Sequence, residues 1–464
     1  MSSPRNVVVI GAGPAGYVCA IRLAQLGQKV TVVEKEYLGG TCLNVGCIPS
    51  KALIAAGALM DKVRHATAMG IQVDGMSLDL PKLVDWKAGI VKRLTGGVGT
   101  LLKQNGVEHV MGAARIVDKN TVEVNGNRLA CDDIVIATGS VPMSIPGFDI
   151  DEDKVWSSTG ALAPSRVPEH LLVIGGGYIG LELGLLYHKL GSQVTVVEFT
   201  DGALPGQDRD CVKIIERSMK KAKIKLLTRH AAKGYESSNG KSFVKVESRD
   251  GGDDTIECDQ ILCTVGRRPY ADGLGLESVG LKLDERGFLA VDKQMRTAVP
   301  NIYAIGDIAG QPMLAHKGSK EGLVAAAVIA GQAEEYDARC VPAVIFTAPE
   351  MASVGMQEDE AREAGHEVRV GQFPFAASGR AMSLMETEGF VKILADAKTD
   401  ELLGVHMVGP EVTELIAEAA LAIEMGATAE DIARTIHAHP TLPEAVMEAA
   451  ESVHKMAVHI YQKK

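Results

Sequence analysis

One segment of the chain occurs twice, and this repeat restricts the possible folds more than any other feature. Residues 9–16 read VIGAGPAG and residues 173–180 read VIGGGYIG, and at the same offset the chain repeats LG, two further residues and VTVVE at 26–34 and 190–198. Each copy has an apolar run typical of a buried strand, a glycine-rich turn, a helical stretch and a second apolar strand. The repeat therefore predicts an α/β fold with two Rossmann-like βαβ units, each binding a dinucleotide.

The three glycines of each Gly-x-Gly-x-x-Gly motif have different expected roles. The first makes the tight turn, the second lets the backbone approach a pyrophosphate at a helix N-terminus, and the third permits close packing of helix against strand. A single motif of this kind could be no more than a tight turn, whereas two complete copies predict two dinucleotide sites. These glycines are Gly11, Gly13 and Gly16 in the first copy and Gly175, Gly177 and Gly180 in the second.

An acid ends the second strand of each copy. Glu34 and Glu198 can accept a hydrogen bond from a ribose 2′-hydroxyl, but they would repel the 2′-phosphate of NADP. Residues 198–203 contain no Arg or Lys that could neutralise such a phosphate. We therefore expect the nicotinamide nucleotide to be NAD rather than NADP.

Composition excludes several classes of protein. With 464 residues, 46% of them apolar, the chain can form two or more domains with sizeable cores. A net charge of −11 argues against nucleic acid or an anionic membrane as a partner, and the lack of about 18 consecutive apolar residues predicts no membrane-spanning helix. Eight cysteines are too few for a secreted disulfide framework and no cleavable leader is recognisable, so we expect a reducing compartment.

Prolines and glycines along the chain indicate where one domain ends and the next begins. Pro142, Pro146 and Gly147 mark a linker into the second βαβ unit, and RRP at 267–269 marks the exit from it. After about residue 340 the pattern changes to strands such as 390–394 and to Ala-rich helices expected at 411–425 and 443–459. The expected parts are a first dinucleotide unit at 1–142, an inserted second unit at 143–270, a return to the first unit at 271–340, and a separate α+β domain at 341–464.

A cysteine pair follows the first acid closely. Residues 39–51 read GGTCLNVGCIPSK and contain Cys42, Cys47 and Lys51. Pro49 suits the first turn of a helix, so Cys47 should lie at a helix N-terminus, where the dipole and the Lys51 cation favour the thiolate. The residues between the cysteines, with Gly46, predict a short, bendable loop that could close a redox-active disulfide. Two merely buried cysteines are the alternative, while a metal site is not expected because no second Cys or His pair has zinc-like spacing. The other six cysteines are expected to be buried packing residues.

Further strings join this segment: ATG at 137–139, YAIGD at 303–307, MLAH at 313–316 and HAHPTLPE at 437–444. Together with GGTCLNVGCIPSK, they resemble the pyridine nucleotide disulfide oxidoreductase family over essentially the whole chain. The resemblance implies a two-part FAD-binding domain at 1–142 and 271–340, an NAD-binding domain at 143–270, and a dimerisation domain at 341–464.

The resemblance also implies roles for individual residues. The disulfide and the nicotinamide would lie on opposite faces of the flavin, with Cys47 toward the flavin and Cys42 exchanging with substrate. Lys51 would lie beside the flavin and pair with Glu182, for which a helix-start residue favoured by the dipole is the less favoured alternative. Asp307 would reach the phosphate and ribityl region of FAD. The other implied cofactor contacts are Gly40, Thr41, Gly112, Thr138, Gly139, Gly266, Met313, Leu314, Ala315 and His316.

A histidine near the C-terminus is the candidate base. Thr441 and Pro443 look like the cap and first turn of the last helix, which would put Glu444 within reach of His439. A carboxylate on one ring nitrogen fixes the tautomer and stabilises the protonated ring. On spacing alone, a structural loop histidine is the favoured interpretation of His439. The resemblance instead implies a His439–Glu444 dyad that acts on the disulfide of the other subunit of a homodimer, with His437 as a supporting group.

The activity that the resemblance implies is FAD-dependent oxidation of protein-bound dihydrolipoamide to lipoamide, with reduction of NAD. The implied partners are the lipoyl domains and core acyltransferase of 2-oxo acid dehydrogenase complexes, or the lipoyl protein of glycine cleavage. The expected location is the cytoplasm or, for a processed chain, the mitochondrial matrix. Another NAD-linked flavoprotein disulfide reductase, or a flavoprotein with an additional structural role in a complex, remains the alternative.

Overall fold

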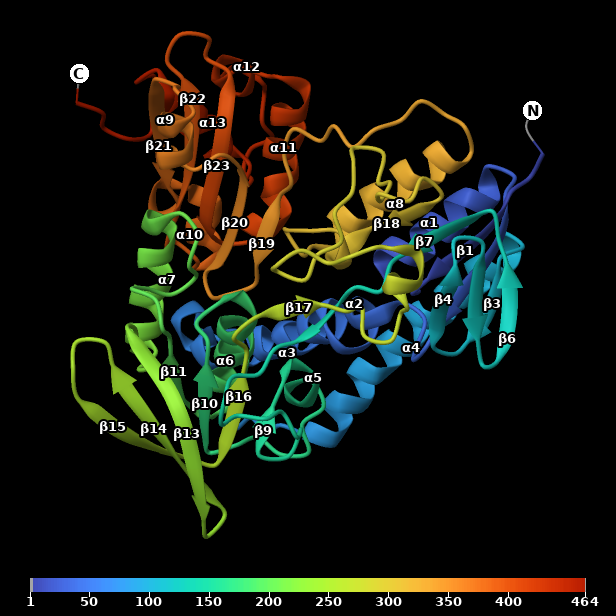
Figure 1. Ribbon diagram of the computed structural model, residues 1–464. Coiled ribbons are helices and arrows are strands. Elements are labelled where there is room, and N and C mark those ends of the chain that lie inside the picture. Colours follow the sequence, from blue (N-terminus) through green and yellow to red (C-terminus); the bar gives the residue numbers. More distant parts are fainter. Residues whose placement is uncertain (1–2, 464) are drawn as a thin grey trace. The chain divides into compact units, whose positions relative to one another are not determined.

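The computed structural model describes residues 3–463, which form two compact units (Figure 1). Of these residues, unit 1 contains 3–167 and Leu262–Asp337, and unit 2 contains Pro168–Ile261 and 338–463. The first glycine motif and the cysteine pair therefore belong to unit 1, whereas the second motif and the C-terminal histidines belong to unit 2. This two-part division does not test the finer domain boundaries expected from the sequence, which remain a prediction.

Unit 1 is built on a five-stranded parallel sheet in the order β18–β7–β1–β2–β3. Its central strands are apolar on both faces, as expected for strands covered on both sides. The strands are β1 (Asn6–Ile10), β2 (Lys29–Glu34), β3 (Glu108–Met111), β7 (Asp133–Ile136) and β18 (Ile302–Ala304). A separate antiparallel sheet contains β4 (Ala114–Asp118), β5 (Thr121–Val124) and β6 (Asn127–Ala130).

Two helices from distant parts of the sequence pack closely in unit 1, α1 (Pro14–Gln25) and α8 (Ala315–Ile329) (Figure 1). A Cβ atom on Gly322 of α8 would come within 2.7 Å of the Ala15 carbonyl oxygen, so only glycine permits this approach. The contact brings the YAIGD and MLAH segments to the first glycine motif. The remaining helices and strands of unit 1 are α2 (Gly40–Val45), α3 (Cys47–His65), η1 (Ala66–Met69), α4 (Leu80–Gln104), β8 (Ser140–Pro142), β9 (Val155–Trp156), α5 (Ser158–Ala161), β17 (Arg267–Pro269), η2 (Leu276–Val279) and η3 (Gly306–Ile308).

Two segments that the sequence marks as linkers lie side by side in unit 1. β8 and β17 pair in antiparallel fashion, with Arg267 opposite Pro142 and Pro269 opposite Ser140. These are segments in which Pro142 and RRP mark a linker in the sequence, and both lie within unit 1.

Residues 40–69 form one helical stretch that is long and apolar enough, by length and composition alone, to cross a membrane. Gly46 divides it into α2 and α3, and Leu53 in α3 is buried in unit 1. Core helices of globular proteins share such length and composition, so the expected lack of a membrane-spanning helix stays a prediction.

Unit 2 repeats the βαβ arrangement and adds an α+β part. β10 (His170–Ile174), β11 (Gln193–Val197) and β12 (Lys225–Leu227) are parallel neighbours, and α6 (Tyr178–Leu190) connects the first two. An antiparallel sheet follows, formed by β13 (His230–Ser238), β14 (Lys241–Ser248) and β15 (Asp253–Cys258). Also in this part are α7 (Arg209–Lys221) and β16 (Gln260–Cys263), the latter spanning the boundary between the units.

The C-terminal part has a five-stranded antiparallel sheet in the order β19–β20–β23–β22–β21, with α11 and α13 packed against it (Figure 1). Its elements are β19 (Ala343–Ile345), β20 (Glu350–Gly355), α9 (Glu358–Glu363), β21 (Val368–Pro374), η4 (Phe375–Ala377), α10 (Gly379–Leu384), β22 (Phe390–Asp396), β23 (Leu402–Gly409), α11 (Val412–Met425), α12 (Ala429–Arg434) and α13 (Glu444–Val453). The prediction of a last helix over 443–459 is wrong at its end, because α13 stops at Val453 and His454 is its C-cap.

Candidate active site

The first glycine motif has the geometry that its spacing predicts. Gly11 has φ +103°, and its N–H donates to the Val33 carbonyl at 2.8 Å. A Cβ atom on Gly16 would lie 1.9 Å from the Gly11 carbonyl oxygen, so this position packs helix α1 directly on the turn. A Cβ atom on Gly13 would meet nothing nearer than the Gly40 Cα at 4.0 Å. Gly13 thus leaves open space at the start of α1, where a phosphate group can approach the backbone.

The second motif has almost the same geometry. Gly175 has φ +102° and donates to the Val197 carbonyl at 2.9 Å, and a Cβ atom on Gly177 would have no heavy atom within 4 Å. Within residues 3–463, no side chain caps the first turn of α1 or of α6. Both helices therefore present their positive ends beside a position without a side chain, which suits a pyrophosphate.

The two acids are buried, and each is anchored in its own βαβ unit. Glu34 accepts from the backbone N–H of Ala12 at 2.8 Å, and Glu198 accepts from that of Gly176 at 2.6 Å. The second carboxylate oxygen of Glu198 accepts from both N–H and O–H of Thr200 at 2.7 Å. Since each carboxylate oxygen has two lone pairs, these bonds orient the acids and still leave acceptor positions for ribose hydroxyls.

Asp307 lies in η3, immediately after β18, and accepts a hydrogen bond from the Ser140 hydroxyl. The Ser140 Oγ in turn accepts from the Arg267 Nε at 2.8 Å. Thr138 donates its hydroxyl proton to the Tyr270 carbonyl. Sequence reasoning missed the Ser140 and Arg267 contribution, although both residues adjoin strings that it did identify.

The other predicted cofactor residues of unit 1 also lie at turns and helix starts. Gly139 (φ +69°) and Gly112 (φ +151°) have backbone conformations that favour glycine, and Gly112 donates to the Glu34 carbonyl at 2.8 Å. Leu314 is the N-cap of α8, and Met313, Ala315 and His316 flank it. Gly266 (φ +136°) accepts from the Met143 N–H at 3.0 Å. The open space beside Gly13 and this cluster of turns fit a bound FAD, although the structure does not test the individual contacts.

The cysteine pair spans two helices rather than a loop. Cys42 lies inside α2, and Cys47 is the first residue of α3. The predicted loop is therefore wrong for residues 43–45, which belong to a helix that starts after Gly39, a residue in the left-handed region. The Asn44 amide donates to the Leu38 and Gly40 carbonyls at 2.8 and 2.9 Å and closes this short turn. The predicted helix N-terminus at Cys47 is confirmed.

The two thiols are in hydrogen-bond contact. This bond to Cys47, together with burial, raises the pKa of Cys42 far above its usual value, while the nearby Lys51 cation opposes the shift. Cys47 is the first residue of α3, and the positive end of that helix dipole favours a thiolate at this position. Five of the other six cysteines are buried as expected, whereas Cys340 is only half-buried.

Glu182 is buried in α6, where its Oε1 accepts from the Phe346 N–H at 2.9 Å. It lies in unit 2 and Lys51 lies in unit 1, so their predicted pairing stays a prediction. The Phe346 contact ties the second βαβ unit to the C-terminal part of unit 2, a role that sequence reasoning did not foresee.

The C-terminal histidines each face a carboxylate. His439 Nδ1 lies 2.8 Å from Glu444 Oε1, and His437 Nε2 lies 2.8 Å from Glu418 Oε1. The expected cap is wrong in detail, because α13 begins at Glu444 and the Thr441 hydroxyl donates to the Ala438 carbonyl instead. The side chain of His439 is 81% exposed, whereas that of His437 is buried. His439 is thus available to an incoming group, and His437 is not.

Comparison with known proteins agrees with this geometry. Residues 5–322 match the model of the pyridine nucleotide-disulphide oxidoreductases, and residues 341–450 match the dimerisation domain of the same family. The chain belongs to this family, and it shares the family's use of FAD and NAD. The α/β class with two Rossmann-like units and a dimerisation domain, the enzyme class and both cofactors are thereby confirmed, and the dimerisation domain supports a homodimer.

Within the family, the chain is most informatively compared with dihydrolipoyl dehydrogenases. It is 51% identical to that of Thermus scotoductus, with 98% of each chain covered. It is 49% identical to that of Geobacillus stearothermophilus, with 99% of this chain and 98% of the other covered. The crystal structure of LpdA from Mycobacterium tuberculosis has a TM-score of 0.90 at 29% identity and covers 96% of this chain and 99% of its own.

Proposed function

We propose that the chain oxidises protein-bound dihydrolipoamide to lipoamide and reduces NAD, as its relatives' name indicates for them. The observation that carries the proposal is the hydrogen-bonded Cys42–Cys47 pair at the start of α3, a few residues beyond Glu34 of the βαβ unit whose glycine motif fits FAD. A thiol pair in this position can be cycled between dithiol and disulfide by a dithiol substrate.

The protein's own residues account for the thiol chemistry. His439 of the partner subunit, held by Glu444 of that same subunit, takes a proton from one substrate thiol. The resulting thiolate attacks Cys42 in the Cys42–Cys47 disulfide. Cys47 leaves as a thiolate, and the second substrate sulfur then displaces Cys42, which leaves as a thiol. Two electrons and one proton have then passed from substrate to the cysteine pair. Bound FAD supplies the two-electron chemistry that links this pair to NAD.

Glu198 is the proposed reader of the NAD ribose. Its carboxylate is fixed at the end of β11 by Gly176 and Thr200, and it can accept from a 2′-hydroxyl but not tolerate a 2′-phosphate. Glu198→Gln should weaken NAD binding roughly tenfold, since a hydrogen bond to a charged group is lost, without changing FAD content. Undiminished NAD affinity would remove Glu198 from this role.

The partners and compartment are proposed on chemical grounds. A lipoyl group on a swinging domain presents the dithiol, so lipoyl domains of 2-oxo acid dehydrogenase complexes or of glycine cleavage are the proposed substrates. A reducing compartment, cytoplasm or mitochondrial matrix, suits a chain that carries few cysteines. The test is purified protein supplied with a reduced lipoyl domain and either NAD or NADP. We expect rapid NADH formation and little NADPH, and a preference for NADP or for glutathione would contradict the proposal.

A further inference from the structure

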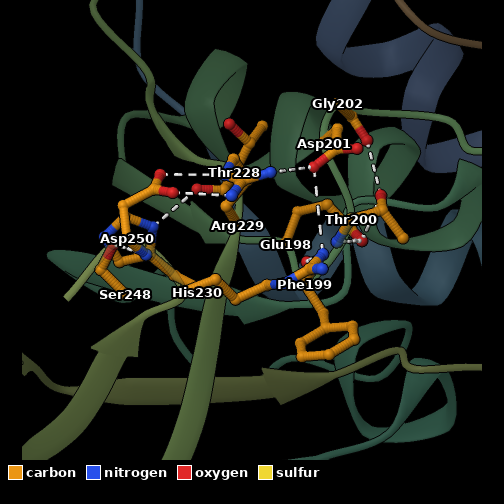
Figure 2. A network of polar contacts seen from close by, with 11 residues as sticks. Glu198, Phe199, Thr200, Asp201, Gly202, Thr228, Arg229, His230, Ser248 and Asp250 are labelled. Carbon is orange, nitrogen blue, oxygen red and sulfur yellow. Dashed lines mark hydrogen bonds and ion pairs between the residues drawn. The ribbon is translucent and has the colours of Figure 1, made fainter.

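Two arginines lie beside the end of β11, although residues 198–203 contain none. The His230 N–H donates to the Glu198 carbonyl at 2.9 Å, which places the start of β13 against the acid (Figure 2). Arg229 precedes this contact, and Arg249 follows β14 and donates its N–H to the Arg229 carbonyl at 2.8 Å. Sequence spacing could not reveal these cations, because they come from a hairpin some thirty to fifty residues further along the chain.

Both guanidinium groups face carboxylates. Figure 2 shows Arg229 between Asp250 and Asp201. Its Nε and Nη2 donate to the two Asp250 oxygens at 2.9 and 2.6 Å, and its Nη1 donates to Asp201 at 2.6 Å. Arg249 lies 3.9 Å from the same Asp201 oxygen and 5.1 Å from the centre of the Phe199 ring. Asp201 therefore faces both arginines.

The backbone at Arg229 is unusual for a residue with a side chain. Its φ is +61°, in the left-handed region that favours glycine or asparagine. The conformation is held by the Arg229 N–H, which donates to the Thr200 carbonyl at 2.9 Å, and it directs the guanidinium toward Asp201. An arginine held in this strained backbone conformation indicates that its side chain has a role.

The balance of charge next to Glu198 is negative despite the arginines. Four carboxylates stand against three guanidinium groups, because Arg209 and Glu216 also contact this segment at Gly202 and Ala203. The carboxylates are those of Glu198, Asp201, Asp250 and Glu216, and the guanidinium groups are those of Arg229, Arg249 and Arg209. The Asp201 and Asp250 side chains are 77% and 65% exposed, so they add to the potential that an approaching nucleotide meets. A 2′-phosphate at this ribose would meet two arginines whose guanidinium groups already pair with Asp201 and Asp250.

We infer that Asp201 and Asp250 are specificity-determining residues: by engaging Arg229 and Arg249, they keep a 2′-phosphorylated dinucleotide out of the ribose site at Glu198. The inference rests on the proposed NAD site. Without these two carboxylates, the same place would hold three cations against two acids, and a 2′-phosphate is accommodated by an arginine of this kind. The ribose site at Glu198 would then attract the 2′-phosphate that it now repels.

The test uses the flavin-loaded protein with the substitutions Asp201→Asn and Asp250→Asn together. The probes are adenosine 2′,5′-bisphosphate and adenosine 5′-monophosphate, and titration calorimetry at low salt measures their affinities. We expect the affinity for the bisphosphate to rise about tenfold, because two negative charges near the 2′ position are removed. The affinity for the monophosphate should change less than about twofold, and kcat/KM with NADP should rise relative to that with NAD.

Two further variants make the test specific. Adding Arg229→Gln to the double variant should abolish most of the gain, since it removes the released guanidinium. Glu236→Gln is the matched control: it removes an exposed carboxylate from the Lys245–Glu236 ion pair (2.7 Å) on the same β13–β14 hairpin, and both affinities should stay unchanged. No gain in the double variant, or a gain that survives Arg229→Gln, would overturn the inference. Failure of the NAD site itself would be recognised separately, by unchanged NAD affinity in Glu198→Gln.

Discussion

Nδ1 of His439 and Oε1 of Glu444 lie 2.8 Å apart across the turn that leads into α13. The other Glu444 oxygen accepts from the Thr441 N–H at 2.7 Å, so the carboxylate is fixed by the backbone. Burial raises the pKa of Glu444, but the bonds from Thr441 and His439 outweigh it and hold the pKa below its usual value. A carboxylate only accepts, so the proton belongs on Nδ1 and Nε2 is the basic nitrogen.

His439→Gln should therefore lower dihydrolipoamide-dependent NADH formation by about 10²–10⁴-fold, the usual contribution of a general base. FAD content should be unchanged, and so should electron transfer from NADH to an artificial acceptor, because neither needs the dithiol step. His65→Gln, which changes an exposed histidine of unit 1, is the control and should retain full activity. Normal dithiol turnover in His439→Gln would refute the role of base.

The cysteine pair gives a second prediction. Cys42→Ser and Cys47→Ser should each reduce dihydrolipoamide oxidation to near the detection limit, because disulfide exchange needs both sulfurs. Each variant should still bind FAD. Cys340→Ser is the matched control. This thiol is half-buried and lies 3.7 Å from the Ala420 carbonyl oxygen, away from the cysteine pair in the sequence. Persistent dithiol oxidation in either pair variant would remove the central chemical claim.

Local patterns predicted much of this site, for identifiable reasons. A glycine with positive φ followed by a helix start leaves a fixed spacing in the sequence, so Gly11, Gly175 and both acids could be found without a structure. The same holds for Cys47, because Pro49 marks the helix start. The helix around Cys42 was missed, since GTCLNV has weak helix propensity and is closed by the Asn44 side chain.

Contacts between distant segments could not be predicted. The Ser140–Asp307 bond, the Glu182–Phe346 bond and the Arg229–Asp201 pair join residues whose separation carries no periodic signal. The end of the last helix was also misplaced, because the Ala-rich pattern continues past Val453 while the backbone does not. In each case, tertiary packing rather than local propensity determines the observed contact or helix end.

A buried ion pair inside unit 2 gives a prediction about stability. Lys392 in β22 lies 2.5 Å from Asp208, the N-cap of α7, and 3.1 Å from Asp210. Asp208→Asn leaves the buried ammonium with one partner, so we expect a loss of about 2–4 kcal/mol in the free energy of unfolding, measured with urea. Lys213→Gln, which removes only the exposed Lys213–Asp210 pair, should change stability by less than about 0.5 kcal/mol.

The pH dependence of this ion pair has a definite sign. Burial raises the pKa of Asp208, but the Lys392 bond outweighs it and the pKa lies below its usual value. The stabilisation is therefore present above the unfolded-state pKa of about 3.9 and is lost as pH falls through the folded-state pKa. The stability gap between the protein and Asp208→Asn should thus narrow below about pH 4. A gap that stays constant to about pH 2 would show that the carboxylate charge is not responsible.

The glycines of the first motif allow packing and cofactor binding to be separated. Gly16→Ala puts a Cβ atom 1.9 Å from the Gly11 carbonyl oxygen, and the backbone on both sides cannot yield, so we expect no stable fold. The Cβ atom of Gly13→Ala would have no heavy atom nearer than 4.0 Å, and the backbone keeps an allowed φ of −69°. The fold of this variant should therefore survive. Its methyl group nevertheless occupies the space where a pyrophosphate approaches, and FAD occupancy should fall severely.

The matched substitution in the second motif should separate the two nucleotides. Gly177→Ala also has open space around its Cβ, so FAD content should remain normal while the KM for NAD rises at least about tenfold. Gly89→Ala in the exposed middle of α4 controls for the added methyl group and should stabilise the protein by about 0.5–1 kcal/mol. Flavin absorbance per chain, thermal unfolding and NAD saturation curves measure the three effects. Loss of FAD in Gly177→Ala, or loss of NAD binding alone in Gly13→Ala, would reverse the assignment of the two motifs.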